Sequence, residues 1–209
     1  MSSAITLAIT GASGAQYALR LLEQLLASGR AVNLLVSKPG QIVLNMESGL
    51  TLSGQPGKMQ RQLVEHFSVD NPGQLSVFGQ DQWTAPVASG TGISRSMVVC
   101  PCTTGTLAGI ATGQSRNLIE RAADVSIKEH KQLILVVRET PLSAIHLENM
   151  LKLARLGVTI MPANPGFYFG VTSVNDLVDF MVARVLDHLD IPHQLTPTWG
   201  VERIDKADD

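Results

Sequence analysis

The sequence is short of charge and of aromatic rings. Only 16% of its 209 residues are charged and 4% are aromatic, while 44% are apolar; soluble domains usually carry about 25% charged residues. So little charge leaves part of the surface apolar, which favours contacts between subunits. The formal net charge of −2 argues against a broad basic surface, so we expect no nucleic-acid partner.

Long hydrophobic runs and cysteines are also scarce. No apolar run reaches the ~18 residues that span a bilayer, and Met1-Ser2-Ser3 supplies no basic segment before the first apolar stretch. We therefore expect a cytoplasmic protein without a membrane span. The cysteines, Cys100 and Cys102, are too close for an ordinary disulfide and too few for a zinc site. They are expected to be reduced thiols near a strand end, and no metal site is expected.

Short apolar runs rich in β-forming residues alternate with segments of helical spacing. The predicted strands are 5–9, 32–36, 97–99, 133–137 and 158–161, and the predicted helices are 14–28, 58–66, 106–112, 117–130, 142–156 and 174–189. This alternation is typical of βαβ units, in which helices cover both faces of a parallel sheet. We predict an α/β, doubly wound, three-layer fold of the flavodoxin or Rossmann type, as one domain over residues 1–201 with a polar tail at 202–209.

The loops that follow the predicted strands are rich in small, hydroxyl and ionic residues. They read Gly11–Gly14, Ser37–Gly40, Pro101–Gly105, Arg138–Pro141 and Pro162–Gly166. Ligands of doubly wound sheets bind outside the carboxyl ends of the strands. One such loop would be weak evidence, because helix caps favour the same residues, but five together indicate a polar, phosphate-bearing ligand.

The first loop does not have the pattern of a dinucleotide site. That motif needs G-x-G-x-x-G and an acidic residue after the second strand, whereas here the turn is G-x-x-G and the second strand ends at Ser37-Lys38. The G-x-x-x-x-G-K-[ST] string of a P-loop is also missing. The remaining possibility is a mononucleotide phosphate held by hydroxyls, by backbone N–H groups at a helix N-terminus and by an Arg.

Several longer motifs resemble one family. They are Thr10-Gly11-Ala12-Ser13-Gly14-Ala15, Cys100-Pro101-Cys102-Thr103-Thr104-Gly105-Thr106, Asn117 to Val125 with Lys128-Glu129, Val137 to Pro141, and Pro165 to Tyr168. The run R-A-A-D-V-x-x-K-E and the turn R-E-T-P are the most specific of them. Over residues 5 to 199 the sequence resembles the UbiX flavin prenyltransferases, once described as 3-octaprenyl-4-hydroxybenzoate carboxy-lyases.

The resemblance implies a chemistry and an assembly. Members of the family have a flavodoxin-like fold and form homododecamers. They transfer a dimethylallyl group from dimethylallyl monophosphate to reduced FMN, first at N5 and then at C6, without a metal. The product, prenylated FMN, serves UbiD-type decarboxylases in ubiquinone biosynthesis and related decarboxylations. We therefore expect FMN, a homo-oligomer and a UbiD-type recipient.

The family's contacts can be carried over position by position. The resemblance implies FMN contacts at Gly11, Ala12, Ser13, Ser37, Cys102, Thr103, Thr104, Gly105 and Arg138. It implies prenyl-phosphate and substrate contacts at Lys128, Tyr168 and Arg184, with Arg121 as a second choice, and at Ala88, Ser89 and Gly90. Catalytic roles fall on Glu139, which would move protons during ring closure, and on Lys128, Ser13 and Glu47. Relatives with Lys in place of Gly105, or His in place of Phe169, differ locally from this chain.

Aromatic faces can stabilise the charge that develops on an allylic group as phosphate leaves, by about 0.5 to 2 kcal/mol each. Trp83 and Trp199 are the candidates, although each could instead anchor a subunit contact. Two other functions stay open at this point: an FMN-dependent cysteine decarboxylase of the same superfamily, and a non-catalytic flavin carrier. The sequence also leaves open the choice between monophosphate and pyrophosphate, the recipient decarboxylase and the size of the oligomer.

Overall fold

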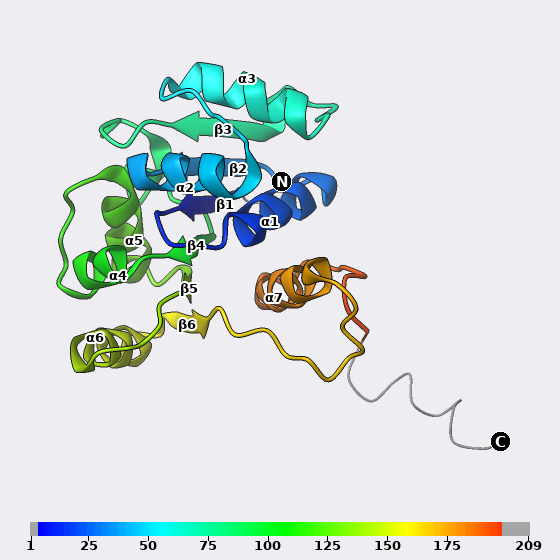
Figure 1. The fold of residues 1–209 in the computed structure, drawn as a ribbon. Helices are drawn as coiled ribbons and strands as arrows, with labels where there is room; N and C mark the ends of the chain where they lie inside the picture. Colours follow the sequence, from blue (N-terminus) through cyan, green and yellow to red (C-terminus); the bar gives the residue numbers. More distant parts are fainter. Residues whose placement is uncertain (1–3, 198–209) are drawn as a thin grey trace. The chain divides into compact units, whose positions relative to one another are not determined.

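A parallel sheet forms the centre of the computed structural model, which describes residues 4–197. Six strands pair in the order β3-β2-β1-β4-β5-β6 (Figure 1). Their bounds are β1 Ile5–Ile9, β2 Val32–Val36, β3 Leu75–Phe78, β4 Ser96–Cys102, β5 Gln132–Val137 and β6 Thr159–Pro162. The strand order reverses between β1 and β4, as in Rossmann-type folds. The predicted α/β class is confirmed, and β3 is a strand in addition to the five predicted ones.

Helices connect the strands. They are α1 Ala15–Ala27, α2 Lys38–Ser48, α3 Pro56–His66, α4 Thr104–Ala111, α5 Leu118–Lys128, α6 Ala144–Arg155 and α7 Val174–His188, with short 3₁₀ turns η1 Pro72–Gln74 and η2 Pro86–Ala88. Crossovers between parallel strands are right-handed. Because the chain moves outward from β1 in one direction and then from β4 in the other, α1 to α3 cover one face of the sheet and α4 to α6 cover the other.

The central strands are mostly apolar and do not alternate apolar with polar residues, because both of their faces are buried. All five residues of β1 and all seven of β4 are buried, because helices cover both faces of these central strands. On the α4–α6 face the core includes Met97, Val99 and Leu135 of the sheet, packed with Leu107 and Leu118 of the helices. The core is therefore aliphatic, in keeping with the low aromatic content.

The chain divides into two compact units, residues 1–163 and residues 164–209. The first unit contains the sheet and helices α1 to α6. The second contains the loop after β6, helix α7 and the segment up to Pro197 that follows it. The single domain expected over 1–201 stays a prediction. Among residues 4–197, no helix combines the length and the apolar character needed to cross a bilayer.

Candidate active site

The carboxyl ends of β1 and β4 meet where the strand order reverses, and one buried hydroxyl joins them. Thr10 Oγ1 donates to the carbonyl of Pro101 at 2.7 Å and accepts from the backbone N–H of Thr103 at 2.9 Å. Both the loop at Gly11 and the turn at Thr103 are thereby held in one place. Thr10 was not among the expected site residues, although a Thr directly before the Gly11 turn is a usable signal for it.

The N-terminus of α1 is occupied by a carboxylate from a distant part of the chain. Glu47 Oε2, near the end of α2, accepts from the backbone N–H groups of Gly14 at 2.9 Å and of Ala15 at 2.8 Å. Burial raises the pKa of Glu47, but hydrogen bonds from Ser13, Gly14 and Ala15 and the nearby Arg138 outweigh it, so the pKa is lowered. Glu47 and Ser13, both expected catalytic residues, therefore lie together, and Glu47 is an anion.

Helix α2 brings Ser37 to the same edge. Its hydroxyl caps the helix by accepting from the backbone N–H of Gly40 at 3.0 Å. A side chain at Gly11 would put Cβ 2.4 Å from Cβ of Pro39. Gly11 is thus required by the close approach of α2 to the first loop, independently of any ligand.

Helix α4 begins at this edge with N–H groups that point away from the helix. Thr103 caps the helix, because its hydroxyl accepts from the N–H of Thr106 at 3.1 Å. No partner for the N–H groups of Thr104 and Gly105 occurs among residues 4–197, and a Cβ on Gly105 would meet nothing within 4 Å. At α1 the corresponding groups bind Glu47. The first turn of α4, unlike that of α1, is therefore a place at this edge where a phosphate can accept backbone hydrogen bonds.

Two ionic residues follow β5 beside that turn. The N–H of Arg138 donates to the carbonyl of Cys102 at 3.3 Å, and Glu139 Oε2 lies 3.5 Å from the hydroxyl of Thr104. Arg138 Nε is buried and has no hydrogen-bond partner in the part of the chain that the structure describes. An unpaired buried guanidinium N–H is unfavourable, and an anionic or carbonyl oxygen of a ligand would satisfy it.

Tyr17 borders this group and was missed by the sequence analysis. A Cβ on Gly14, whose φ is +120°, would lie 2.7 Å from Cδ2 of Tyr17, so the ring covers the first loop. Burial raises the pKa of Tyr17, with a smaller rise from Cys100 and an opposing effect from Arg138. The tyrosine therefore stays neutral at physiological pH, on the side of the site where Arg138 lies.

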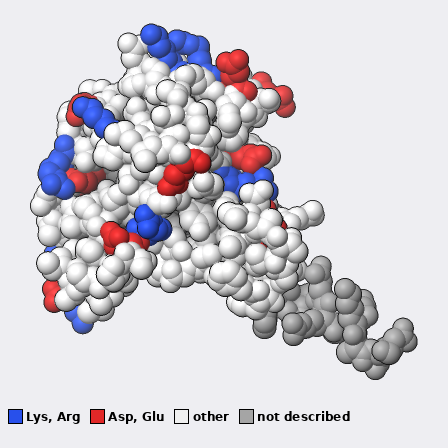
Figure 2. Space-filling view, viewed as in Figure 1, with Lys and Arg blue, Asp and Glu red and all other residues white. Residues whose placement is uncertain are grey.

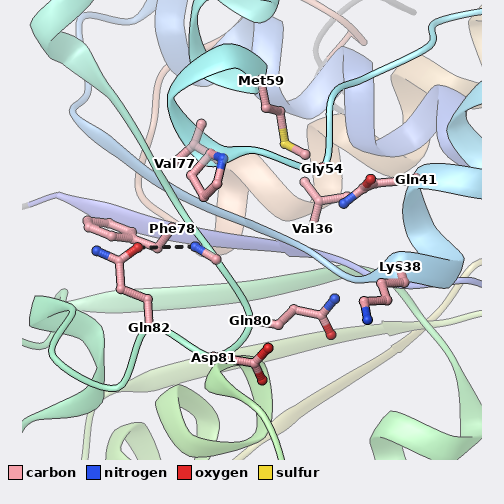
Figure 3. Close-up of a pocket in the computed structure, with 12 residues that line it drawn as sticks. Val36, Lys38, Gln41, Gly54, Met59, Val77, Phe78, Gln80, Asp81 and Gln82 are labelled. Carbon is pink, nitrogen blue, oxygen red and sulfur yellow. Dashed lines mark hydrogen bonds between the residues drawn. The ribbon is translucent and has the colours of Figure 1, made fainter.

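Next to Ser37 the structure has a cavity of about 520 Å³ (Figure 3). The volume is in the range of small-molecule sites. Its lining comes from α2, α3, β2, β3 and the turn after β3. The cavity residues are Val36, Lys38, Gln41, Gly54, Pro56, Met59, Val77, Phe78, Gly79, Gln80, Asp81 and Gln82. Figure 3 shows Lys38, Gln80 and Asp81 gathered on one side, and the apolar Val36, Met59 and Val77 on the other together with Gln41. The lining is therefore mostly polar on one side and mostly apolar on the other.

A second group of expected residues lies along α5. Arg121 Nε donates to the carbonyl of Ala88 at 3.1 Å, and Lys128 forms an ion pair with Glu129. A Cβ on Gly90 would lie 2.3 Å from Glu129 Oε1, so the loop of Ala88 to Gly90 follows α5 to its end. Lys128 ends α5 just before β5 begins, whereas Glu139 comes just after β5 ends. Six residues of strand separate them by roughly 20 Å.

The second unit brings Tyr168 and Arg184 to one helix. The ring of Tyr168 lies 6.0 Å from that of Phe180, edge to face, and Phe180 precedes Arg184 by one turn of α7. Arg184 forms an ion pair with Asp187 at 2.7 Å. Phe180 therefore lies between the two expected phosphate ligands of this unit, in contact with Tyr168 and one helical turn before Arg184.

Of the two tryptophans expected near the prenyl donor, the structure describes Trp83 and not Trp199. Trp83 lies in the turn after β3, adjacent in sequence to the cavity residue Gln82, with 47% of its surface exposed. Trp199 lies outside the described residues. The role of either tryptophan with a prenyl donor stays a prediction.

The two thiols near the site are buried and protonated. Burial raises the pKa of Cys102 to about 12, and it raises that of Cys100 further. Both cysteines are free. They line the sheet as small apolar residues, and Cys102 contributes to the site through its backbone.

The surface matches the low charge of the sequence. On the face shown in Figure 2 uncharged residues predominate, and the charged ones are scattered with both signs mixed. Large apolar side chains are exposed on several helices, among them Ile42 and Met46 on α2 and Ile145, Leu147 and Leu151 on α6. Such exposure is typical of surfaces that bind another protein chain.

Comparisons with known proteins agree with this geometry. The family model described as Flavoprotein matches residues 1–186. The flavin prenyltransferase UbiX of Pseudomonas aeruginosa is 54% identical over 200 residues, covering 96% of this chain and 95% of that protein. Curated relatives with the same name at 46% and 39% identity come from Halalkalibacterium halodurans and Methanothermobacter thermautotrophicus, covering 95% and 93% of this chain and 94% of each relative.

Solved structures show the same fold. AnUbiX (PadA1), solved in complex with FMN and dimethylallyl pyrophosphate, has a TM-score of 0.83 at 35% identity and covers 95% of this chain and 98% of its own. A dodecameric, FMN-dependent Ubix-like decarboxylase from Escherichia coli O157:H7 has a TM-score of 0.82 at 35% identity, covering 93% of this chain and 98% of its own.

The residues present fit FMN. The first turn of α4 offers open N–H groups to a phosphate, and the buried Nε of Arg138 needs an acceptor that the described chain does not supply. The relatives that match nearly the full chain are named flavin prenyltransferases. These names support neither of the two alternatives, a cysteine decarboxylase and a flavin carrier. The chain is an FMN-dependent transferase and belongs to the flavin prenyltransferase UbiX family.

Proposed function

We propose that the chain transfers the dimethylallyl group of dimethylallyl monophosphate to N5 and then C6 of reduced FMN, with release of phosphate. One cluster of side chains near the first turn of α4 is the main support for this proposal. It consists of Ser13, Glu47, Arg138 and Glu139. The relatives' names support the class of reaction. AnUbiX was solved with the pyrophosphate, so the choice of the monophosphate is the finer part of this proposal.

FMN is held by the carboxyl edge of the sheet in this proposal. The N–H groups of Thr104 and Gly105 receive its phosphate, and Thr103 keeps that turn in shape. Arg138 donates its Nε–H, which has no partner within the described residues, to a flavin oxygen. Ser37 faces the same edge, and the cavity beside it offers space for a ring with one polar and one apolar side.

The carboxylates have different tasks. Glu47 is fixed by two backbone N–H groups and holds Ser13, so it orients that hydroxyl toward the flavin. Glu139 lies at the other side of the α4 turn, near Thr104, and moves the protons that ring closure requires. Reduced FMN supplies the nucleophilic N5 and C6; these side chains supply position and proton transfer.

The phosphate of the prenyl donor is bound by Lys128, Tyr168 and Arg184, with Arg121 near the loop of Ala88 to Gly90. Lys128 lies at the amino edge of the sheet, a strand length from Glu139. One chain cannot bring both to one substrate, so we propose that Lys128 acts in the site of a neighbouring copy. The exposed apolar residues of α2 and α6 support such an assembly, and a dodecamer like that of the Escherichia coli relative is its proposed form.

The reaction is tested by mass spectrometry of the flavin. Purified chain is incubated anaerobically with reduced FMN and dimethylallyl monophosphate, and in a second arm with the pyrophosphate. A flavin heavier by one five-carbon unit in the first arm supports the proposal; an unchanged flavin mass in both arms refutes it. Glu139→Gln should retain FMN and lose most product, and full turnover by that variant would remove Glu139 from the mechanism.

The shared site is tested by mixing two inactive variants. Lys128→Ala and Glu139→Gln chains are dissociated together and reassembled, so that some sites combine an intact Lys128 from one copy with an intact Glu139 from another. Recovered activity is expected. Mixed assemblies as inactive as either parent would place both residues in one chain's site.

Prenylated FMN is a product that another enzyme must use. We propose a UbiD-type decarboxylase as its recipient and a cytoplasmic location for the hand-over. The recipient rests on the family resemblance, and the location rests on the scarcity of long apolar runs in the sequence. Transfer of the extracted product to a decarboxylase that lacks its cofactor would test the first.

A further inference from the structure

A carboxylate and a histidine are linked to Arg184 in the second unit. Arg184 Nη1 lies 2.7 Å from Oδ2 of Asp187, one turn further along α7. The other carboxylate oxygen, Oδ1, lies 3.0 Å from Nε2 of His193. Asp187 therefore uses one oxygen for the arginine and the other for the segment that follows the helix. Neither Asp187 nor His193 was among the residues expected from the sequence.

Hydrogen bonds assign the tautomer of His193. The backbone N–H of Leu195 donates to Nδ1 at 3.3 Å, so that nitrogen carries the lone pair. The hydrogen of the neutral ring is then on Nε2, where it is donated to Asp187. The side chain is only 10% exposed. His193 thus fixes Asp187 from a position that is itself held by the backbone.

The Arg184–Asp187 pair is half-exposed, at 52% and 46%, and such pairs add little to stability. Their effect is on geometry. An arginine side chain has many rotamers. The Asp187 carboxylate, whose other oxygen is hydrogen-bonded to His193, favours the Arg184 rotamers that point along α7. The guanidinium has five N–H donors, so the one that faces Asp187 leaves others for an anion.

We propose that Asp187 and His193 are positioning residues that hold the Arg184 guanidinium in place for the phosphate of the prenyl donor. The inference rests on the proposed function, in which Arg184 binds that phosphate. A pre-oriented arginine loses less conformational entropy when the substrate binds. Removing its support therefore weakens substrate binding while the chemical step keeps its rate, because neither residue touches the reacting atoms.

The test compares KM with kcat in the FMN-loaded enzyme. Asp187→Ala is expected to raise KM for dimethylallyl monophosphate about fivefold and to change kcat less than about twofold. Asp187→Asn has the same size but one acceptor oxygen for two donors, and its NH2 faces the other donor, so it should raise KM nearly as much as Asp187→Ala. Asp190→Asn, which removes the same charge three residues further on, is the matched control. Calorimetric titration of dimethylallyl monophosphate into FMN-loaded enzyme gives the same comparison without turnover.

A double-mutant cycle separates positioning from a merely structural effect. If Asp187 acts through Arg184, the Arg184→Ala/Asp187→Ala chain binds the substrate as weakly as Arg184→Ala alone. For the histidine, His193→Ala should raise KM and His193→Gln, which retains an N–H donor, should restore it. Melting temperatures of all variants check that the fold is intact.

Each remaining outcome counts against the inference. A normal KM in Asp187→Ala, a lowered KM, or effects of Asp187→Ala and Arg184→Ala that multiply would overturn it while Arg184 keeps its proposed role. A normal KM in Arg184→Ala would instead refute the phosphate role of Arg184 in the proposed function, and this inference with it. FMN affinity, which should be unchanged throughout, shows that the flavin site is unaffected.

Discussion

Glu47 and Gly14 are 33 residues apart in sequence, yet the carboxylate of one accepts the backbone N–H of the other at 2.9 Å. The same oxygen accepts from Ala15, so Glu47 does for α1 what a Ser or Asp cap does for most helices. The interaction stabilises the first loop and keeps a negative charge beside Ser13. It also occupies the first N–H groups of α1, so of these two helices α4 is the one that can receive a phosphate at this edge.

The first prediction concerns Glu47 and pH. Its pKa is lowered in the folded chain, so its contribution to stability is complete above the ordinary carboxyl pKa of 4.5 and is lost as pH falls through the folded value. Glu47→Gln should therefore reduce the free energy of unfolding by about 1 kcal/mol near pH 7. In acid, where wild type is also protonated, the difference should vanish. Urea unfolding at both pH values measures it, with the exposed Glu65→Gln as control; a loss that does not depend on pH would contradict the role of charge.

The second prediction concerns Arg138. Because its buried Nε has no partner in the described chain, Arg138→Met should change the free energy of unfolding of the flavin-free protein by less than about 0.5 kcal/mol. The dissociation constant for FMN should rise about 10- to 100-fold, because that is the loss of affinity expected when one charged hydrogen bond is removed. Urea unfolding and fluorescence titration of FMN give the two quantities. Unchanged FMN affinity would mean that Arg138 faces something other than the flavin.

The third prediction uses two glycines of the site as a matched pair. Gly11→Ala forces Cβ to within 2.4 Å of Pro39, whose ring is rigid, and should lower the free energy of unfolding by about 2 kcal/mol. At Gly105 a Cβ meets nothing within 4 Å, so Gly105→Ala should be neutral or stabilise by up to about 1 kcal/mol. Thermal unfolding of the flavin-free variants tests both. Equal destabilisation by the two substitutions would show that the loop at Gly11 and the first turn of α4 are packed equally tightly.

The fourth prediction concerns the thiols. With its pKa raised to about 12 by burial, Cys102 carries only about one thiolate per ten thousand molecules at pH 8. Neither it nor Cys100 should react with dithiobis(nitrobenzoate) in the native protein, and both should react after denaturation in guanidinium. Rapid labelling of the native chain at pH 8 would show that this edge of the sheet opens.

Much of the fold could be predicted from local patterns. β-Branched and aliphatic runs predicted β1, β2, β5 and β6, and the Gly–Ser–Thr loops after them predicted the edge that binds the ligand. The strand predictions held because strand formation depends on neighbours in the sequence, whereas the ligand-binding role of that edge stays a prediction. The motif around Lys128 predicted the family, which the relatives confirm, although it could not say where Lys128 would lie.

The sequence by itself determined a parallel α/β sheet with few charges and a flavin prenyltransferase family, and it predicted a phosphate-binding edge. Only the tertiary structure decided that Glu47 reaches α1, that the buried Arg138 Nε finds no partner among residues 4–197, and that Lys128 and Glu139 lie at opposite ends of β5. The reason is physical. Periodicity reports which face of an element is buried, whereas the partners of a polar side chain depend on how elements far apart in the chain pack together.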